Sequence, residues 1–250
     1  MVETAVLQEV ACIRSKHPRI GARKLYHMLR PETMGRDRFE ALLMRAGFRL
    51  TVSRSYTRTT YAYKGHRFDN LITGLDITAT DQLWVSDITY FRYKQRFYYL
   101  TFITDVFTRK IIGFKVSDNL MAEANIKALK MALKGKNKDK LKGLIHHSDR
   151  GTQYIHHQYL ALLEQHGIQV SMGNKAWENA HAERINGIIK NEYLNHMSFS
   201  DNDSLTRKLR SIIRLYNSQR PHGRLPAMMT PEQMETSNLK NMNYKVKINY

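Results

Sequence analysis

The chain has few acidic residues for its length and almost no cysteine. Its 250 residues include 22 Asp and Glu against 40 Lys and Arg, for a formal net charge of +18. The single cysteine, Cys12, excludes an internal disulfide and fits a reducing cytoplasm. No apolar run approaches the roughly 20 residues that a membrane helix needs, and the first residues do not resemble a signal peptide. These absences predict a cytoplasmic protein without a membrane span.

A phosphate-binding loop of the form G-x-x-x-x-G-K-[ST] is also missing, so ATP hydrolysis finds no support. What the chain has is a hydrophobic content of 42%, enough for a real core. Its positive charge favours nucleic acid as the partner, although solubility or association with ribosomes would account for the same excess. We therefore expect a globular protein that binds nucleic acid.

Residues 1–50 predict a small helical module. Apolar residues recur at helical spacing over 2–16, 22–29 and 36–45, Pro31 ends the second helix, and Gly47 suits the end of the third. Three short helices of this kind resemble a DNA-binding helix-turn-helix unit, and a helical cap packed on the main domain is an equally supported alternative. The basic side chains that favour DNA are Arg23, Lys24, Arg36 and Arg38.

Residues 51–75 lack periodicity and read as a linker. Arg54 and Arg58 alternate there with tyrosines. Basic side chains neutralise phosphates and tyrosines stack on bases or sugars, which favours a linker that tracks DNA over an inert one.

Residues 76–200 predict an α/β domain. Three β-branched and aromatic runs predict consecutive antiparallel strands, followed by alternating helices and strands and by a long helix that begins near Asn179. This order is that of the ribonuclease H-like fold, a five-stranded mixed sheet with flanking helices. Residues 201–250 add a C-terminal helix and a basic tail. The expected strands are 82–93, 97–107, 110–116, 144–147 and 168–172, and the expected helices are 122–133 and 157–166.

Three carboxylates in distinctive local phrases are the candidate catalytic and metal-binding residues. They are Asp87 in W-V-S-D-I-T-Y, Asp149 in H-H-S-D-R-G-T-Q-Y, and Glu183 in W-E-N-A-H-A-E-R-I-N-G. Spacing alone would leave them as surface acids, but Asp87 falls mid-strand, where an acid is costly unless it is used or paired. Acids converging in a cationic protein suit Mg²⁺ beside a phosphate. Asp105 competes for this role, and we expect it to pair with Arg109 instead.

Polar neighbours of these acids have less specific signals. His146 and His147 lack the further Cys or His of a zinc site, so we expect His147 to orient the loop of Asp149. Lys190 lies two helical turns from Glu183 on the same side and suits a DNA phosphate, with an ordinary salt bridge as the alternative. Asn179 is the expected cap of the long helix.

Together these phrases closely resemble the orfB-type transposases of the insertion sequence 3 family, relatives of retroviral integrase. The match spans about residues 18–232 and includes G-A-R-K-L-Y-H-M-L-R, N-A-H-A-E-R-I-N-G-I-I-K-N-E and the terminal Y-N-S-Q-R-P-H. In one departure, the chain has two fewer residues between Asp149 and Glu183 than is usual in the family. The shortening falls in the loop that precedes the long helix.

The resemblance implies a transposase that uses Mg²⁺, with Mn²⁺ as a substitute, and in which Asp87, Asp149 and Glu183 bind the metal. It implies that Lys190 contacts transposon-end DNA and that Arg220, which we also expect at the DNA, belongs to a family signature with Tyr216, Asn217, Pro221 and His222. The implied partners are double-stranded DNA, further copies of the chain, and the product of an upstream frame as a fusion partner, in a nucleoid-associated protein. A DNA-binding regulator without catalysis and a structure-specific nuclease are the competing hypotheses.

Overall fold

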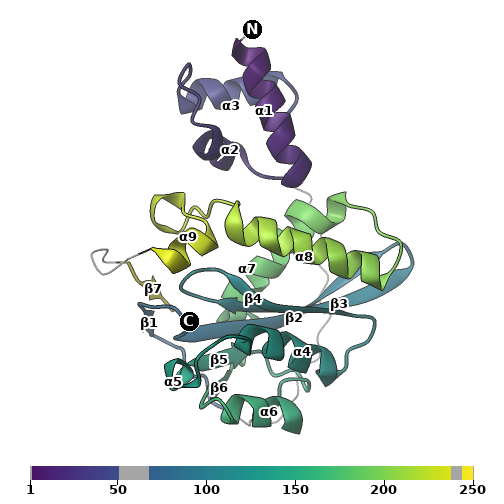
Figure 1. Ribbon diagram of the computed structural model, residues 1–250, viewed down its shortest axis with the longest axis vertical. Helices are drawn as coiled ribbons and strands as arrows, with labels where there is room; N and C mark the ends of the chain where they lie inside the picture. The colour runs from purple at the N-terminus through teal and green to yellow at the C-terminus, as the bar shows by residue number, and fades with distance from the viewer. Residues whose placement is uncertain (1, 51–67, 238–243, 250) are drawn as a thin grey trace.

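The computed structural model describes residues 2–50, 68–237 and 244–249 of the chain. A small helical module stands beside a larger α/β body, with the long helix α8 (Asn202–Ser218) facing it (Figure 1). Arg54 and Arg58, predicted to contact DNA, lie outside the described residues. Within the described residues, no helix is long and apolar enough to cross a membrane.

The N-terminal module consists of the three helices that the sequence predicts, α1 (Val2–Lys16), α2 (Ala22–Leu29) and α3 (Arg36–Arg45). Their apolar faces meet in a core that includes the fully buried side chains of Val10, Leu25 and Phe39. Gly47 adopts φ +75° after α3, a left-handed conformation that favours glycine and ends the helix.

The α/β body is built on a five-stranded mixed sheet in the order β4-β3-β2-β5-β6. Strands β2, β3 and β4 are antiparallel neighbours, whereas β2–β5 and β5–β6 pair in parallel. This topology confirms the predicted ribonuclease H-like sheet. The strands are β2 (Leu83–Tyr93), β3 (Arg96–Asp105), β4 (Ile111–Ser117), β5 (Ile145–Ser148) and β6 (Gln169–Met172).

Helices cover both faces of the sheet (Figure 1). One face packs on α4 (Ala122–Leu133) and α6 (His157–Glu164), with the short α5 (Lys138–Leu141) at its edge. The approach of α4 is close: a Cβ on Gly113 of β4 would lie 2.3 Å from the Ala128 carbonyl oxygen, so only glycine fits. The other face packs on α7 (Ala180–Ile188), the π-helical turn η2 (Ile189–Tyr193), η3 (Leu194–His196) and α8.

Strand β2 sorts its side chains between these two faces. Because side chains alternate along a strand, Trp84 and Ile88 pack toward α4 and α6, whereas Phe91 packs toward α7 and α8. Asp87 has the parity of Phe91 and therefore projects to the α7 side. The strand thus presents its one mid-strand carboxylate to the helix that carries Glu183.

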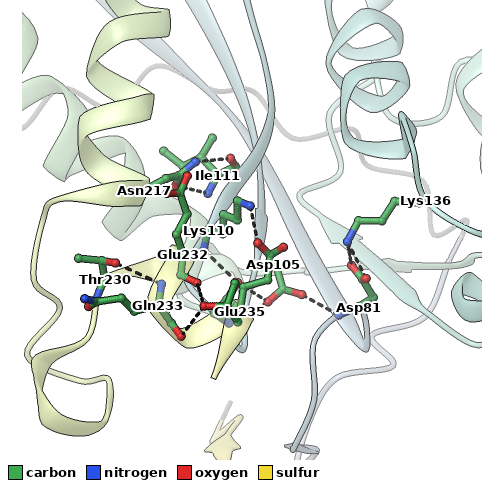
Figure 2. Close-up of polar contacts among 12 residues, drawn as sticks. Asp81, Asp105, Lys110, Ile111, Lys136, Asn217, Thr230, Glu232, Gln233 and Glu235 are labelled. Atoms are coloured by element: carbon green, nitrogen blue, oxygen red, sulfur yellow. Dashed lines mark hydrogen bonds and ion pairs between the residues drawn. The ribbon is translucent and has the colours of Figure 1, made fainter. Parts of the chain in front are cut away.

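The C-terminal segment belongs to the same body. Helix α8 extends the core formed by β3 and β4, α9 (Pro231–Thr236) follows the single turn η4 (Pro226–Met228), and strand β7 (Val246–Lys247) pairs with β1 (Asp76–Ile77). Asn217 at the end of α8 joins the edge strand: its Oδ1 accepts from the Ile111 nitrogen at 3.0 Å, and its Nδ2 donates to the Ile111 oxygen at 2.9 Å (Figure 2). One amide side chain thereby continues the ladder of the sheet.

Candidate active site

Asp87 lies in β2, and Asp149 directly follows β5, the parallel neighbour of β2. Val85 of β2 and His147 of β5 are the last paired residues, and this register, continued by two residues, places Asp87 opposite Asp149 just past the end of β5. Neighbouring strands are about 4.8 Å apart, and equal steps of two keep both side chains on the same face. The register therefore brings together two acids that are far apart in sequence.

Glu183 comes to the same place from α7. It lies in the first turn of that helix and is exposed, whereas Asp87 and Asp149 are partly buried. Burial and the negative charges of Asp149 and Glu183 raise the pKa of Asp87 well above its usual value. Burial also raises the pKa of Asp149, and burial and Asp149 raise that of Glu183. The shortened loop therefore leaves Glu183 within electrostatic reach of both aspartates.

Mutual repulsion of this kind is what a cation relieves. Within the described residues, however, no three His, Cys, Asp or Glu side chains form a group that could hold one ion as they stand. The arrangement is thus a pair of level aspartates with a third, solvent-facing carboxylate coupled to them.

Two asparagines of the α7 segment connect it to β2. Asn186 Nδ2 donates to Asp87 Oδ2 at 2.6 Å, and Asn179 Nδ2 donates to the Ser86 carbonyl oxygen at 2.9 Å. Asn179 occupies the N-cap position of α7, as predicted, but its side chain makes no capping hydrogen bond. Sequence reasoning missed the role of Asn186, although its position one turn after Glu183 was a signal that both share a helix face.

The neighbouring polar residues are mostly structural. The predicted pairing of Asp105 with the Arg109 side chain is wrong. Asp105 instead accepts from the Thr108 nitrogen and hydroxyl at 2.8 and 2.7 Å, and the Arg109 guanidinium contacts His181. His147 Nδ1 bonds to the Ser171 hydroxyl at 2.8 Å, so its ring links β5 to β6. Burial and the charge of His147 lower the pKa of His146 to about 3.

Of the described side chains predicted to contact DNA, four lie where DNA could reach them or beside the acids, and two bind a partly buried acid of the chain. Lys190 lies near the acids: its Nζ is 3.4 Å from the Tyr90 carbonyl oxygen, burial lowers its pKa, and Asp87 opposes that shift. Arg23, Arg36 and Arg38 are exposed on the helical module. They form one set of cations that DNA could reach.

Lys24 and Arg220 point instead to a partly buried acid, Glu192, which the DNA-contact prediction did not foresee. Arg220 has 3% of its side chain exposed and binds Glu192 through two bonds of 2.6 and 2.7 Å. Lys24 Nζ lies 3.8 Å from the same carboxylate, and the Tyr193 hydroxyl lies 2.8 Å from His17 Nδ1. Glu192 and Tyr193 belong to the π-helical turn η2, which thus connects α7 to the helical module and to the terminal signature.

Comparison with known proteins places the chain in a family. Two integrase core domain models match residues 78–176 and 165–231. A 31 kDa protein of insertion element IS600 from Shigella sonnei is 35% identical over 226 residues, which cover 87% of this chain and 81% of that protein. The transposase InsF of insertion sequence IS3A from Escherichia coli K12 is 30% identical over 236 residues, or 92% of this chain and 81% of that one.

A solved structure supports the fold. A chain of the simian T-cell lymphotropic virus intasome in complex with PP2A regulatory subunit B56 gamma superposes with a TM-score of 0.51 at 21% identity, covering 64% of this chain and 57% of that one. The ribonuclease H-like integrase core fold is therefore shared well beyond close relatives. With matches across most of its length to insertion-element proteins, the chain belongs to the IS3 family of insertion-sequence transposases.

Proposed function

We propose that the chain is a Mg²⁺-dependent transposase that cuts one DNA strand at the end of its insertion sequence and joins the resulting 3′-hydroxyl to a target phosphodiester. The observation that supports this most directly is the strand register that pairs Val85 with His147, each two residues before Asp87 and Asp149. Electrostatic coupling of Glu183 to both acids completes a set of three carboxylates.

The residues present fit a divalent ion. Mg²⁺ prefers hard oxygen donors and keeps several waters, so Asp87, Asp149 and Glu183 suffice as protein ligands, and Mn²⁺ accepts the same set. When bound, the metal activates the attacking oxygen and stabilises the leaving one during in-line displacement at phosphorus. Burial raises the pKa of all three carboxylates, and the charges of Asp149 and Glu183 add to the shift at Asp87, so a nearby cation would favour their ionised forms.

The chain's own side chains orient the reactants. Asn186 fixes one oxygen of Asp87 through a 2.6 Å bond, and Lys190 beside Asp87 supplies a positive charge for a phosphate oxygen of the DNA. Exposed Arg23, Arg36 and Arg38 neutralise phosphates farther along the duplex, and Arg54 and Arg58 of the linker serve the same purpose. Two transposon ends must meet for integration, so at least two copies of the chain act together, with the upstream-frame product as a fusion partner.

Replacement of Asp87 by Asn tests the proposal. Asp87→Asn should abolish strand cutting and strand transfer while DNA affinity stays within a few-fold of wild type, because one ligand is lost and the basic surface is intact. The matched control is Asp139→Asn, whose side chain is 81% exposed on α5 and should leave both steps unchanged. Retained strand transfer in Asp87→Asn would contradict the assignment.

A second candidate function is a DNA-binding regulator of the element that does not catalyse. The observation that favours it is that, within the described residues, no three potential ligand side chains are close enough together to hold one metal ion. Wild-type chain that binds terminal DNA but neither cuts nor joins it with Mg²⁺ or Mn²⁺, even when fused to the upstream-frame product, would favour this function.

A further inference from the structure

A solvent-exposed tryptophan, Trp177, lies in the loop that precedes α7, between Asp149 and Glu183 in the sequence. The chain has two tryptophans: Trp84 is fully buried, whereas 58% of Trp177 is exposed. Exposing so large an apolar ring to water is unfavourable, and tryptophan is enriched where a partner covers it. Trp177 is therefore a large apolar ring that a ligand could cover.

The segment that carries Trp177 is attached to both aspartates' strands. At its start, the Gly173 nitrogen donates to the Ser148 carbonyl oxygen at 2.9 Å, immediately before Asp149. At its end, Asn179 donates to the Ser86 carbonyl oxygen at 2.9 Å, immediately before Asp87. The turn η1 (Ala176–Asn179) is thus fixed between the end of β5 and the middle of β2.

A carboxylate inside the segment makes it rigid. Glu178 Oε2 accepts from the backbone nitrogens of Asn174 and Lys175 at 2.5 and 3.3 Å. The backbone is therefore preorganised, and a ligand stacking on Trp177 would order little more than the ring itself.

A cation accompanies the ring. Lys175 Nζ lies 4.8 Å from the centroid of the Trp177 ring, and both side chains are exposed. An aromatic face beside an ammonium group suits a nucleotide, because the base stacks on the ring while the cation meets the phosphate. Inside a duplex both faces of a base are already stacked, so only an unpaired base or a terminal pair has a free face.

We propose that Trp177 stacks on an unpaired or terminal base next to the phosphodiester that is cut at Asp87 and Asp149, and that Lys175 contacts an adjoining phosphate. Trp177 is then a substrate-positioning residue that holds the DNA end open at the acids. The inference rests on the proposed transposase function for the identity of the DNA, but its binding step is measured separately.

Tryptophan fluorescence of the full chain provides the binding test. The probe is a duplex carrying the terminal inverted repeat of the chain's own element with its last two base pairs mismatched, in Ca²⁺ to prevent cutting. Stacking should quench Trp177, whereas Trp84 is buried in the core and should not respond. The same repeat closed at both ends by hairpins should quench less, and Trp177→Phe should remove the DNA-dependent change.

Cleavage of the same DNA in Mg²⁺ provides the functional test. Trp177→Ala should lower kcat/KM by roughly 5- to 150-fold, the loss expected for one stacked base, and Trp177→Phe should recover most of it. The matched control is Phe97→Ala. Like Trp177, Phe97 is an exposed aromatic residue, at 53%, with a cation near its ring: the Arg92 guanidinium lies 5.6 Å from the ring centroid. This pair is far from the acids, because Arg92 lies five residues beyond Asp87, about 16 Å along β2. The Phe97→Ala variant should therefore cut DNA as wild type does.

The outcomes separate this inference from the proposed function. Wild-type chain that cuts the DNA without any change in tryptophan fluorescence overturns the stacking and leaves the transposase function standing. Quenching that is lost in Trp177→Phe supports the stacking even if Mg²⁺ and Mn²⁺ produce no cutting, a result that would contradict the proposed function alone. Equal losses in Trp177→Ala and Phe97→Ala would also overturn the inference.

Discussion

The Asn186 side-chain amide donates to Asp87 Oδ2 across 2.6 Å, and so links helix α7 directly to strand β2. Glu183 lies one turn earlier on the same helix. A single rigid helix therefore carries one acid and orients another, and a shift of α7 would displace both. Asn186 is 5% exposed, so its amide has little freedom to exchange this bond for water.

Asn186→Ala should lower the cutting rate about 10- to 100-fold, the usual effect of removing a group that orients a metal ligand. The Asp87 carboxylate would remain but would sample several rotamers. DNA affinity should not change, because no cation is lost. Rates of strand cutting, measured beside Asn191→Ala on the exposed face of the neighbouring turn, check this; equal rates in the two variants would argue against an orienting role.

The Glu192 carboxylate should be essential for stability. It faces Arg220, whose side chain is 3% exposed, and Lys24, so its removal leaves a buried guanidinium without its acid. Glu192→Gln should reduce the free energy of unfolding by about 3 kcal/mol. Urea denaturation measures this loss.

A double replacement distinguishes the charge pair from simple packing. Glu192→Leu with Arg220→Met removes both charges and keeps apolar volume, so it should unfold less readily than Glu192→Gln alone. If the double variant is instead the least stable of the set, the segment depends on the pair for its conformation rather than on neutralisation of Arg220.

The terminal signature should act through the fold. Asn217→Ala removes both bonds to Ile111 and leaves the peptide groups of an edge strand unpaired, at a cost of about 1–3 kcal/mol. Asn195→Ala, an exposed asparagine, serves as the control. Thermal unfolding of the two variants checks this, and loss of DNA binding in Asn217→Ala without loss of stability would count against it.

Much of this structure follows from periodicity in the sequence. Helix 122–133 and the three helices of the module have the predicted bounds, because apolar residues recur every three or four positions and Pro31 and Gly47 mark ends. The strands differ by one or two residues, and Asp87 lies in the middle of β2, as predicted. The local pattern of apolar residues was therefore sufficient to predict the bounds of these helices and, to within two residues, of the strands.

Side-chain contacts between different elements of the fold were not predictable from periodicity. The side chains of Arg109 and Asp105 lie near in sequence but bind elsewhere, and Arg220 finds Glu192 only because a π-helical turn interrupts the regular helix after Ile188. No periodic pattern in the sequence marks that turn, since its extra residue shifts the register by less than one turn.

Stability should fall in mild acid because of buried neutral histidines. Burial lowers the pKa of His146 to about 3, and burial with nearby cations, Arg220 first, lowers that of His222 to about 2. Below about pH 6.5 the unfolded chain binds protons that the folded protein does not, so stability is lost as pH falls from 6.5 toward 3, by about 1.4 kcal/mol per pH unit for each histidine.

Denaturation midpoints at pH 6 and pH 5 check this pH dependence. His146→Gln keeps an acceptor for the Tyr159 hydroxyl, which lies 2.9 Å from His146 Nε2, and should reduce the slope by one proton. His157→Gln is the control, since that side chain is exposed to water. An unchanged slope in His146→Gln would show that the ring is protonated in the folded protein.

Asp87 should destabilise the metal-free protein and stabilise the metal-bound one. Burial, Asp149 and Glu183 raise its pKa, so above the usual value the unfolded chain releases a proton that the folded protein retains, and stability falls as pH rises through that window. In EDTA at neutral pH, Asp87→Asn should therefore have a free energy of unfolding that is larger than that of wild type by on the order of 1–3 kcal/mol, and so a higher unfolding temperature. Saturating Mg²⁺ should add about 2.7 kcal/mol to wild type at 100 times its Kd and little to Asp87→Asn, reversing the order. Thermal unfolding with and without Mg²⁺ measures both effects without any assay of activity, and equal stabilisation of the two proteins by Mg²⁺ would place the ion away from Asp87.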